Sequence, residues 1–454
     1  MTQLPIMAGT VVKDGTFAAS YPVNLEPRAL DSGVSKGQLV TTRGAVSLGT
    51  GPGIDRGGIN WNDTLYRVMG SKLVRVSAGG VVTVLGDVGT DGLVCGFDYS
   101  FDRLGIRSAN KLYYWNGTTL TLVTDPDLGK VKDILWMDGY FLTTDGTFVI
   151  ATELLDPTNV NPLKYGSAEQ DPDAVTGLLK YREELYALGR YTIQVFQDVG
   201  GLNFPFQVVK GATIPYGCIS ATAKCMVGGT FAFVGGAKDE PLGVFVYAGG
   251  TAARISNKDV EALIAAEADP ALIVLEARRF GEESQIIMHL TGQSVGIALH
   301  TSAQADDGAW FYLQSGRFAP YRLRNAVLYY GKHWVGDTQT AAVGTLSDQT
   351  VTHFGAAADW RFDAALLYAG TAICLDEVEL IGQWPLTGVA VFFSLTRDGV
   401  QWSNEISRVT TGRRDERIVW RPSVSFPVLG SARWRGTGRV AIARAEMQAE
   451  QLTT

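Results

Sequence analysis

Short clusters of acidic side chains are the first residues in this sequence whose types and spacing could do chemistry. Glycosidases cleave sugars with two carboxyl groups, and a propeller can collect such groups from distant blades. The groupings that qualify by residue type are Glu153 with Asp156, Glu169 with Asp171 and Asp173, and Asp306 with Asp307. No spacing among them identifies an acid–base pair, so they are candidates by type alone.

A second candidate for sugar chemistry is the segment SLTRDGVQW, Ser394 to Trp402, which is similar to the Asp-box turn of sialidases. Here Gly399 directly follows Asp398, as in a two-residue hairpin turn. We therefore expect a turn with a packing tryptophan and no catalytic role.

The spacing of histidine, cysteine and glycine argues against several other chemistries. The histidines (His289, His300, His333, His353) are scattered, and none lies in an HExxH motif, so no zinc site is expected. The cysteines (Cys95, Cys218, Cys225, Cys374) form no CxxC pair, which predicts free thiols in a reducing compartment. No GxSxG elbow is present. The glycine-rich run 49–53 lacks the Gly-Lys-Ser/Thr ending of a phosphate loop, so we expect a plain turn there.

The elements that must position these residues are short β-strands in a repeating pattern. A strand–turn–strand unit recurs about every 40 residues, as in propellers and other repeat arrays. Its copies begin near Leu65, Arg103, Tyr140, Glu184, Phe231, Gln285 and Ala326. Asn116-Gly117 and Asp145-Gly146 favour tight hairpins between such strands. The pattern predicts a propeller-like domain of six or seven blades, depending on whether the seventh repeat completes the first by strand exchange.

Changes of composition divide the 454 residues into three predicted units. Residues 1–60, rich in Gly, Ser, Thr and Pro, are expected to be an irregular segment with short strands that packs on the body. Residues 61–352 carry the repeats. Residues 353–454 read as a separate antiparallel β-sandwich with longer strands and a hairpin at Asp398-Gly399. The predicted fold class is all-β.

Two segments depart from the strand pattern. Residues 156–174 are polar, broken by prolines and longer than a typical hairpin loop, and such loops usually contact a partner or act in function. A tolerated insertion is the alternative. Residues 256–266 predict a helix capped by Ser256, with Val260, Leu263 and Ile264 on its apolar face.

The second half of the predicted sandwich is rich in arginine and tryptophan. Arginine interleaved with Trp402, Trp420 and Trp434 is a mixture enriched at protein interfaces. Three interpretations stay open: pairing with acids on a solvated face, contact with a protein, and contact with a nucleic-acid backbone. The candidate assembly contacts are Arg413, Arg414, Arg417, Arg433 and Arg435.

The net charge of −7 argues against tight binding of duplex DNA, which needs Lys and Arg to displace counterions. A mildly acidic surface repels phosphate and would suit a wall along which DNA slides, although ordinary solubility explains the charge equally well. No window approaches about 18 apolar residues, and the N-terminus lacks a signal-peptide pattern. We therefore expect neither a membrane anchor nor a secretion signal.

Several segments resemble, in the same order, the packaged-DNA stabilisation proteins of short-tailed bacteriophages, which are also called tail-hub or nozzle proteins. The central match runs from Asp156 to Ile264 and includes DPTNVNPLKYGSAEQDPDA, NFPFQVVKGATIPYGCISATAKC, FAFVGG and ISNKDVEALI. YPVNLEP and LYRVMGSKLVRV are similar to the family's opening strand and first hairpin, and FFSLTRDGVQWS and RIVWRPSV to its closing sandwich. The resemblance covers nearly the whole chain and is weaker before residue 60 and over 293–351.

The resemblance implies a structural virion protein that is not an enzyme and holds no cofactor. Its subunits would form a homohexameric ring in the phage tail, below the portal–adaptor complex. The ring would retain packaged DNA, provide the channel for genome ejection and carry a needle, fibres or spikes. Its partners would be copies of itself, the head-to-tail adaptor protein, the needle and fibre proteins, and duplex DNA in transient non-specific contact. Assembly would take place in the cytoplasm of the bacterial host.

The resemblance also suggests a role for the polar loop. Lys164, Tyr165, Glu169, Asp171 and Asp173 become candidates for a contact with the lumen or with a partner. The three acids would keep DNA from adhering to the wall.

Two other functions stay open. One is a carbohydrate-binding or glycoside-cleaving propeller of a virion tail, and the other is a host propeller that serves as a protein-interaction platform. A hub predicts a hexameric ring, a glycosidase predicts sugar turnover that depends on two carboxylates, and a host platform predicts a monomer. The arginine-rich sandwich favours assembly, because a closed ring needs two complementary patches on each subunit.

Overall fold

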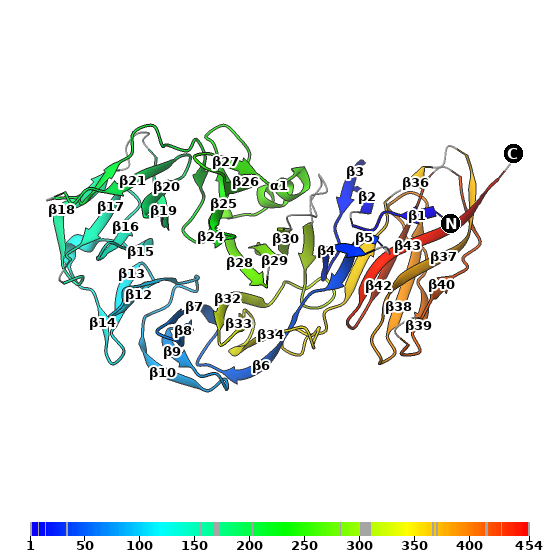
Figure 1. Ribbon diagram of the computed structural model, residues 1–454, viewed down its shortest axis with the longest axis horizontal. Helices are drawn as coiled ribbons and strands as arrows, with labels where there is room; N and C mark the ends of the chain where they lie inside the picture. Colours follow the sequence, from blue (N-terminus) through cyan, green and yellow to red (C-terminus); the bar gives the residue numbers. More distant parts are fainter. Residues whose placement is uncertain are drawn as a thin grey trace.

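The computed structural model shows two β-rich bodies side by side, a ring of blades and a pair of packed sheets (Figure 1). It describes residues 2–7, 9–13, 15–32, 35–154, 156–167, 173–201, 203–281, 283–299, 310–365, 367–368, 371–413, 416–427 and 429–452. The strands of the named sheets pair antiparallel, and one α-helix lies among the described residues. The predicted all-β class, with a propeller and a C-terminal sandwich, is confirmed.

Seven antiparallel sheets of four or five strands form the blades of the ring. The strands of blades one to four are β7 (Asp55–Trp61), β8 (Thr64–Met69), β9 (Lys72–Val76), β10 (Val82–Asp87); β11 (Gly96–Tyr99), β12 (Leu104–Ser108), β13 (Lys111–Trp115), β14 (Leu120–Leu122); β15 (Asp133–Met137), β16 (Tyr140–Thr144), β17 (Phe148–Thr152), β18 (Val160–Ser167); and β19 (Val175–Tyr181), β20 (Glu184–Gly189), β21 (Ile193–Asp198), β22 (Phe206–Val208). Those of blades five to seven are β23 (Gly217–Cys218), β24 (Lys224–Val227), β25 (Thr230–Gly236), β26 (Gly243–Tyr247), β27 (Ala252–Arg254); β28 (Val274–Phe280), β29 (Glu283–His289), β30 (Ser294–Leu299), β31 (Trp310–Leu313); and β32 (Leu323–Tyr329), β33 (Lys332–Asp337), β34 (Ala342–Ser347), with β6 (Gly44–Thr50). Figure 1 views this ring along its axis, with β15, β19, β24, β28 and β32 facing the centre.

The ring is closed by a strand that precedes the first blade in the sequence. β6 pairs with β34 from Thr50↔Ala342 to Gly44↔Ser347 and becomes the outer strand of the seventh blade. The number of blades is therefore seven. The sequence suggested strand exchange in the opposite direction, with the seventh repeat completing the first. Joining two ends of the chain in one sheet leaves no open blade edge at the closure.

The repeat found in the sequence marks the second strand of most blades. Its first six starting points coincide with the beginnings of β8, β12, β16, β20, β25 and β29. These strands are prominent because neighbouring blades cover both of their faces, as in β8 and β20, where five of six residues are buried. Turns occur at both predicted positions, with Gly117 and Gly146 at φ of 94° and 107°, and both are longer than two residues.

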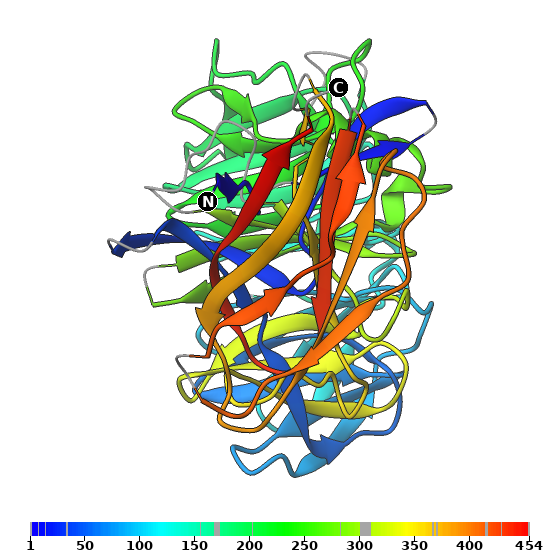
Figure 2. The same cartoon turned by 90° about the vertical axis from the view of Figure 1, so that its right-hand side faces the viewer.

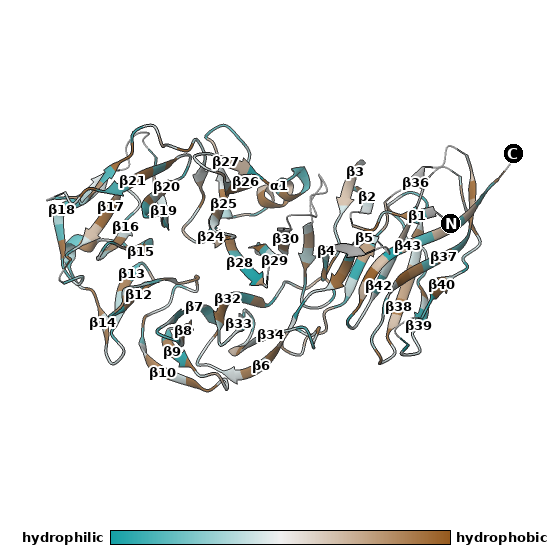
Figure 3. Ribbon diagram, in the orientation of Figure 1, coloured by the Kyte–Doolittle hydropathy of each residue, from teal (hydrophilic) through white to brown (hydrophobic). Residues whose placement is uncertain are grey.

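The hydrophobic core lies between blades and joins neighbours in turn. One cluster packs Trp61 and Val68 of blade one against Leu104 and Ile106 of blade two. The largest described cluster runs through blades four, five and six. Figure 3 shows hydrophobic and hydrophilic residues alternating along the strands, including hydrophilic positions on β28 near the axis. Polar residues at the axis therefore coexist with an apolar core between the blades.

The smaller body is a sandwich of two sheets. One sheet contains β4 (Leu25–Ser32), β5 (Ser35–Thr41), β43 (Ala441–Gln451), β37 (Ile373–Gln383) and β40 (Ile418–Trp420), with β1 (Thr2–Leu4) and β41 (Val424–Phe426) at its side. The other contains β35 (Trp360–Asp363), β42 (Leu429–Gly436), β38 (Ala390–Thr396) and β39 (Ile406–Val409), with β36 (Leu367–Tyr368). Figure 2 looks onto this body, whose long strands lie in front of the propeller.

The tryptophans of the sandwich belong mostly to its core. Trp360, Trp420 and Trp434 are at most 1% exposed and lie in one apolar cluster. Phe362 stacks on Trp434 with ring centroids 5.0 Å apart. Trp420 and Trp434 therefore stabilise the sandwich from inside, so they are unavailable for the interface that their spacing with arginine suggested.

The N-terminal segment is more regular than the sequence suggested. Residues 1–60 contain β1, β4 and β5 of the sandwich, the hairpin of β2 (Gly9–Lys13) with β3 (Thr16–Ser20), and β6 of the propeller. Pairing with distant strands orders residues whose own composition favours turns. The limits of the three predicted units stay a prediction, because strands of this segment belong to both bodies.

A short stretch of the same segment joins the two bodies through backbone hydrogen bonds. Val23 exchanges hydrogen bonds with Arg361 of β35 at 2.7 and 3.1 Å, and Asn24 N donates to Tyr312 O of β31 at 2.8 Å. The buried Asn24 side chain adds bonds to the carbonyl oxygens of Gln314 and Asp359, at 3.0 and 2.8 Å. Blade six and the sandwich are thus linked by continuous backbone pairing.

The helix begins two residues later than predicted and has a different cap. Helix α1 spans Lys258–Ala265, and Asn257, not Ser256, caps it by accepting from Val260 N at 3.1 Å. Ser256 instead donates to Glu261 at 2.9 Å. Val260 and Ile264 are buried as predicted. Two short 3₁₀ turns cover Pro126–Leu128 and Pro270–Leu272.

The Asp398-Gly399 turn forms, but the predicted two-residue hairpin is wrong, because the residues directly after the turn do not form the strand that pairs with β38. Asp398 accepts from Val400 N and Gln401 N, both at 2.8 Å. After the single bridge between Thr396 and Trp402, the chain runs on to β39, which pairs with β38. The turn is therefore longer than a two-residue hairpin.

Candidate functional site

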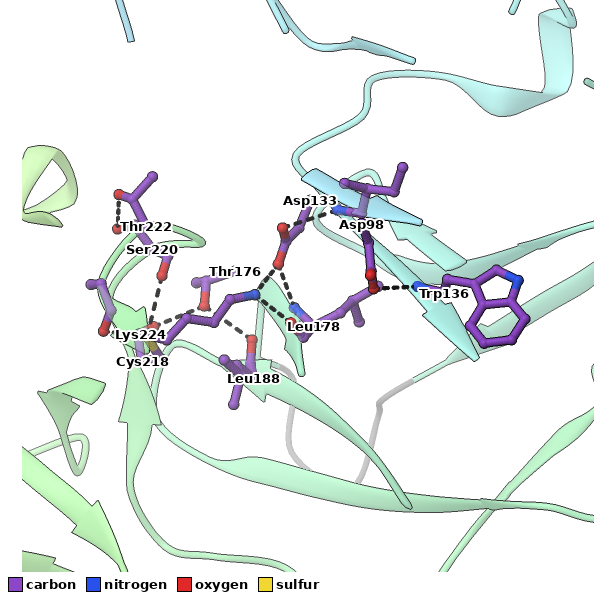
Figure 4. Close-up of polar contacts among 12 residues, drawn as sticks. Asp98, Asp133, Trp136, Thr176, Leu178, Leu188, Cys218, Ser220, Thr222 and Lys224 are labelled. Atoms are coloured by element: carbon purple, nitrogen blue, oxygen red, sulfur yellow. Dashed lines mark hydrogen bonds and ion pairs between the residues drawn. The ribbon is translucent and has the colours of Figure 1, made fainter. Parts of the chain in front are cut away.

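The axis of the propeller holds a polar network that links one blade to the next (Figure 4). Asp133 of blade three accepts from Leu178 N of blade four at 2.8 Å and from Lys224 Nζ of blade five. Lys224 Nζ also donates to Leu178 O. Both side chains are largely buried, so the pair excludes water and fixes three blades at once.

Hydroxyl groups extend this network around the ring. Thr176 Oγ1 lies 2.9 Å from Cys218 O and 3.0 Å from Leu188 O, which ties blade four to blade five. Thr222 Oγ1 donates to Ile273 O at 3.0 Å, at the start of blade six. Each contact satisfies the hydrogen-bonding capacity of a backbone carbonyl.

Asp98 on the inner strand of blade two has a raised pKa. Its carboxylate accepts from Trp136 N of blade three at 2.6 Å and from Tyr99 N at 2.8 Å. Burial nevertheless raises the pKa of Asp98 to about 6, and the two backbone donors offset only part of that effect. Asp98, Asp133 and Trp136 line an axial pocket of about 590 Å³.

The closure of the ring has its own buried charge pair. Arg67 of blade one donates to Asp55 at 2.6 and 2.7 Å, and neither side chain is more than 1% exposed. Asn325 of blade seven donates to Asp55 at 2.7 Å, and its carbonyl accepts from Arg67 at 3.0 Å. The first and seventh blades are therefore joined at the axis as well as through β6.

The predicted polar loop 156–174 is wrong over Val160–Ser167, because backbone pairing with β17 makes these residues β18, the outer strand of blade three. Its described residues make internal contacts. Lys164 pairs with Glu153 at 2.8 Å and lies over the Tyr140 ring, while Tyr165 OH donates to Asp127 O. Asp173 accepts from the backbone N–H groups of Arg190, Tyr191 and Thr192, at 2.9, 2.6 and 2.9 Å. Asp173 thus fixes a turn of blade four. Glu169 and Asp171 lie outside the described residues.

Three of the predicted assembly arginines make ion pairs within the sandwich. Arg417 pairs with Glu379, Arg433 with Asp363 and Arg435 with Glu405, at 2.5, 2.6 and 2.6 Å. The Arg417 guanidinium, 65% exposed, holds the pKa of Glu379 below its usual range. Arg413 is exposed in the segment between β39 and β40, and Arg414 lies outside the described residues.

Arg433 and Arg435 also line a cavity of about 430 Å³ at the joint between propeller and sandwich. Arg433 stacks on Trp402 at 3.8 Å from the ring centroid, and Arg435 stacks on Phe392 at 4.0 Å. Arg317 and Arg361 bring two further cations, and Phe318 at the same cavity is 70% exposed. A cavity with cations and accessible rings suits recognition of a protein surface.

The groupings expected by residue type do not assemble into a catalytic site within the described residues. Glu153 is paired with Lys164, and Asp156 accepts from Thr158 and Asn159 in an exposed turn. Asp306 and Asp307 lie outside the described residues. No cluster of three metal-ligating side chains occurs among the residues described. Cys95, Cys218, Cys225 and Cys374 are free thiols, and Cys95 and Cys218 are buried.

Sequence reasoning missed the axial residues. Asp98, Asp133 and Lys224 lie in three different repeats, so their proximity follows only from the closed ring. One signal was available, since Asp98 and Asp133 both fall in the strand that precedes a repeat start.

No helix in the described chain is long and apolar enough to cross a membrane.

Comparison with known proteins gives consistent matches over both bodies. A family model described as "Bacteriophage P22 Gp10, beta-propeller" matches residues 2–351, and one described as "Bacteriophage P22 Gp10, beta-sandwich" matches residues 359–450. The chain is 25% identical over 455 aligned positions to the tail hub protein gp10 of Salmonella phage P22, covering 92% of this chain and 93% of that protein.

Solved structures give weaker similarity. The N-terminal domain of Nup159 matches with a TM-score of 0.41 and 10% identity, over 71% of this chain and 98% of that one. The Pan2 WD40 domain of Neurospora crassa matches with a TM-score of 0.41 and 9% identity, over 69% and 98%. We draw no functional argument from similarity at this level.

Proposed function

The chain belongs to the bacteriophage P22 Gp10 family, and on that premise we propose that it is a structural tail-hub component of a bacteriophage virion, without enzymatic activity. The observation that carries the proposal is the match of both family models, in order, to the propeller and the sandwich. The relative in phage P22 is named a tail hub protein, and the alignment spans nearly the full length of both chains. The role includes assembly with other tail components.

We further propose that six copies form a ring below the head-to-tail adaptor protein. In this arrangement the ring retains packaged DNA, conducts it during ejection and supports the needle, fibres or spikes. Two structural properties of the subunit support this proposed role. The propeller is closed twice, by β6 and by the Asp55–Arg67 pair, and it is fused to the sandwich by backbone pairing at Val23.

A set of arginines divided between the two sheets of the sandwich is the proposed assembly contact, with Arg417 beside Glu379 of β37 and Arg433 beside Asp363 of β35. Arg413, Arg414, Arg417, Arg433 and Arg435 are the residues assigned to it. Pairing of Arg417, Arg433 and Arg435 with acids of the same chain neutralises their charge, so they would contribute planar stacking surfaces and spare N–H donors. A heterologous contact of roughly 2,000 Å² or more is typical of an obligate ring.

The polar loop remains the proposed contact with the lumen or a partner. Glu169 and Asp171 would repel DNA. Asp173 instead accepts backbone hydrogen bonds that stabilise a turn of blade four. Charge reversal should therefore be applied to Glu169 and Asp171 only. Unchanged DNA retention and ejection in that double variant would remove the loop from the proposal.

The carbohydrate-cleaving alternative has its best residue in Asp98, since a general acid needs a raised pKa. The nearby Asp133 is occupied by Lys224 and Leu178 N, and Asp98 by Trp136 N, so both carboxylates hold blades together. This arrangement favours a structural role for the pair. Turnover of a host polysaccharide that is abolished in Asp98→Asn would reverse that judgement.

The proposed role is tested by deleting the gene from the phage that encodes this chain. Particles assembled without the protein should package DNA and then lose it, because nothing seals the portal channel. DNA content of purified heads is measured with and without the protein supplied in trans. Heads that keep a full genome and remain infectious without the protein would contradict the proposal.

A further inference from the structure

The propeller axis opens on one side into a pocket of about 580 Å³ that no proposed role uses. Residues of blades two to seven and of the links between them line it. Lys132, Ala174 and Val274 lie at the beginnings of inner strands, which places the pocket at the mouth where those strands start. The pocket adjoins the axial cavity around Asp98, with which it shares Ala221, and it shares no lining residue with the cavity at the joint.

The charge of this axial-mouth pocket is entirely positive. Arg107, Lys132 and Arg324 line it, and none of the described lining residues is acidic. Arg107 is only 7% exposed. The Nε atoms of Arg107 and Arg324 are buried without a hydrogen-bond acceptor among the described residues. Arg324 Nη2 donates to Leu290 O at 3.1 Å.

Such an arrangement is costly unless something satisfies it. A buried N–H donor without an acceptor loses its hydration, and no hydrogen bond replaces it. Burial lowers the pKa of Arg324, whereas the charges of Glu276 and Glu267 act in the opposite direction. An anion placed in the pocket would add acceptors beside these guanidinium groups and neutralise their charge.

The rest of the wall restricts the kind of anion. Leu93, Val94, Ile219 and Leu272 present apolar surface beside the three cations. Hydroxyl groups of Ser220 and Thr222 provide further polar contacts. A ligand with carboxylates next to aliphatic side chains matches this mixture, whereas a phosphate–sugar backbone has no aliphatic side chains to pack on the apolar part of the wall.

We propose that the axial-mouth pocket binds a short acidic peptide segment of a partner protein. A carboxylate of that segment contacts Arg107 and Arg324, Lys132 guides it from the rim, and neighbouring aliphatic side chains pack on Leu93 and Leu272. Charge-assisted hydrogen bonds supply orientation, and the apolar wall supplies burial. The inference stands on the pocket itself and does not depend on the tail-hub role.

The test measures binding of a labelled peptide to the full-length chain by fluorescence anisotropy. The probe is a short peptide of alternating leucine and glutamate, compared with the same peptide containing glutamine and with a short oligothymidylate. Binding of the glutamate peptide alone is expected. Lys132→Ala, at an exposed position, and Arg107→Gln should each weaken it by about tenfold or more.

The matched control is Lys238→Ala, which removes an exposed lysine outside the pocket and changes the net charge equally. It should bind the glutamate peptide as the natural chain does. Thermal unfolding separates loss of binding from loss of fold, and Lys132→Ala decides the case if Arg107→Gln is unfolded.

Three results would overturn the inference. The first is no binding of the glutamate peptide or equal binding of the glutamine peptide. The second is equal affinity in Lys132→Ala and Lys238→Ala. The third is tighter binding of the oligothymidylate that Lys132→Ala abolishes, which would assign the pocket to nucleic acid.

Discussion

At the scale of single residues, buried ionisable side chains concentrate in blades six and seven. Glu276 pairs with Arg278 at 2.6 Å, and His289 lies 3.5 Å from the same carboxylate. Arg278 also donates to Tyr321 OH at 2.9 Å, and Arg278 holds the pKa of Glu276 well below its usual range against the effect of burial. Two further histidines, His333 and His353, lie in or beside blade seven. These groups make stability depend on pH.

Stability should fall as pH falls from about 6.5 to about 4. Burial lowers the pKa of His289 and His333 to about 4 and of His353 to about 3, so the folded state keeps them neutral where the unfolded chain takes up protons. A shift of one pKa unit corresponds to about 1.4 kcal/mol.

Asp98 acts in the opposite direction in the same window. Its pKa is raised to about 6, so its contribution is largest at low pH and is lost as pH rises through that value. One carboxyl group offsets only part of the effect of three histidines, and a net fall is expected. Urea unfolding across this range measures it, and a flat stability between pH 6.5 and 4.5 would refute the assignment.

Arg67→Met should lower the free energy of unfolding by about 3–5 kcal/mol, because it leaves Asp55 buried without its cation. Arg103→Met is the matched control, since Arg103 pairs at 2.7 Å with an Asp102 that is 50% exposed. That change should cost less than about 1 kcal/mol. Equal losses in the two variants, measured by urea denaturation, would show that the Asp55–Arg67 pair does not secure the closure.

At the scale of elements, the sequence predicted what recurs and missed what closes the ring. The repeat could be read because β8, β12 and β16 are buried on both faces and turn residues punctuate them. The pairing of β6 with β34 could not be predicted, since the residues of β6, such as Gly44, Ala45 and Val46, do not indicate a partner strand about 300 residues away. The axial residues were missed for the same reason. The predicted cap Ser256 lies one residue before the actual cap Asn257, because helix ends are uncertain by a residue or two.

The closing strand can be tested with one methyl group. A Cβ at Gly344 would collide with the carbonyl oxygen of Val46 on β6, so Gly344→Ala should destabilise the protein by about 1–3 kcal/mol and expose β6 to protease. Gly292→Ala adds the same group where no atom lies within 4 Å. The control should change stability by less than about 0.5 kcal/mol. Indistinguishable thermal unfolding of the two variants would mean that β6 does not close the propeller.

At the scale of the whole molecule, backbone hydrogen bonds join the two bodies. Val23 and Asn24 connect β31 of the propeller with β35 of the sandwich, while β4 and β5 carry the chain from the joint into the far sheet. The order of the two family matches follows the same division.

The most direct test of the tail-hub role is electron microscopy of the purified chain mixed with the portal–adaptor complex of its phage. If the chain is a tail hub, six copies should form a ring beneath the adaptor, with an open axial hole. The sandwich arginines should lie at contacts between subunits or with the adaptor. A chain that stays monomeric and does not join the adaptor, with Arg413 and Arg414 fully solvated, would contradict it.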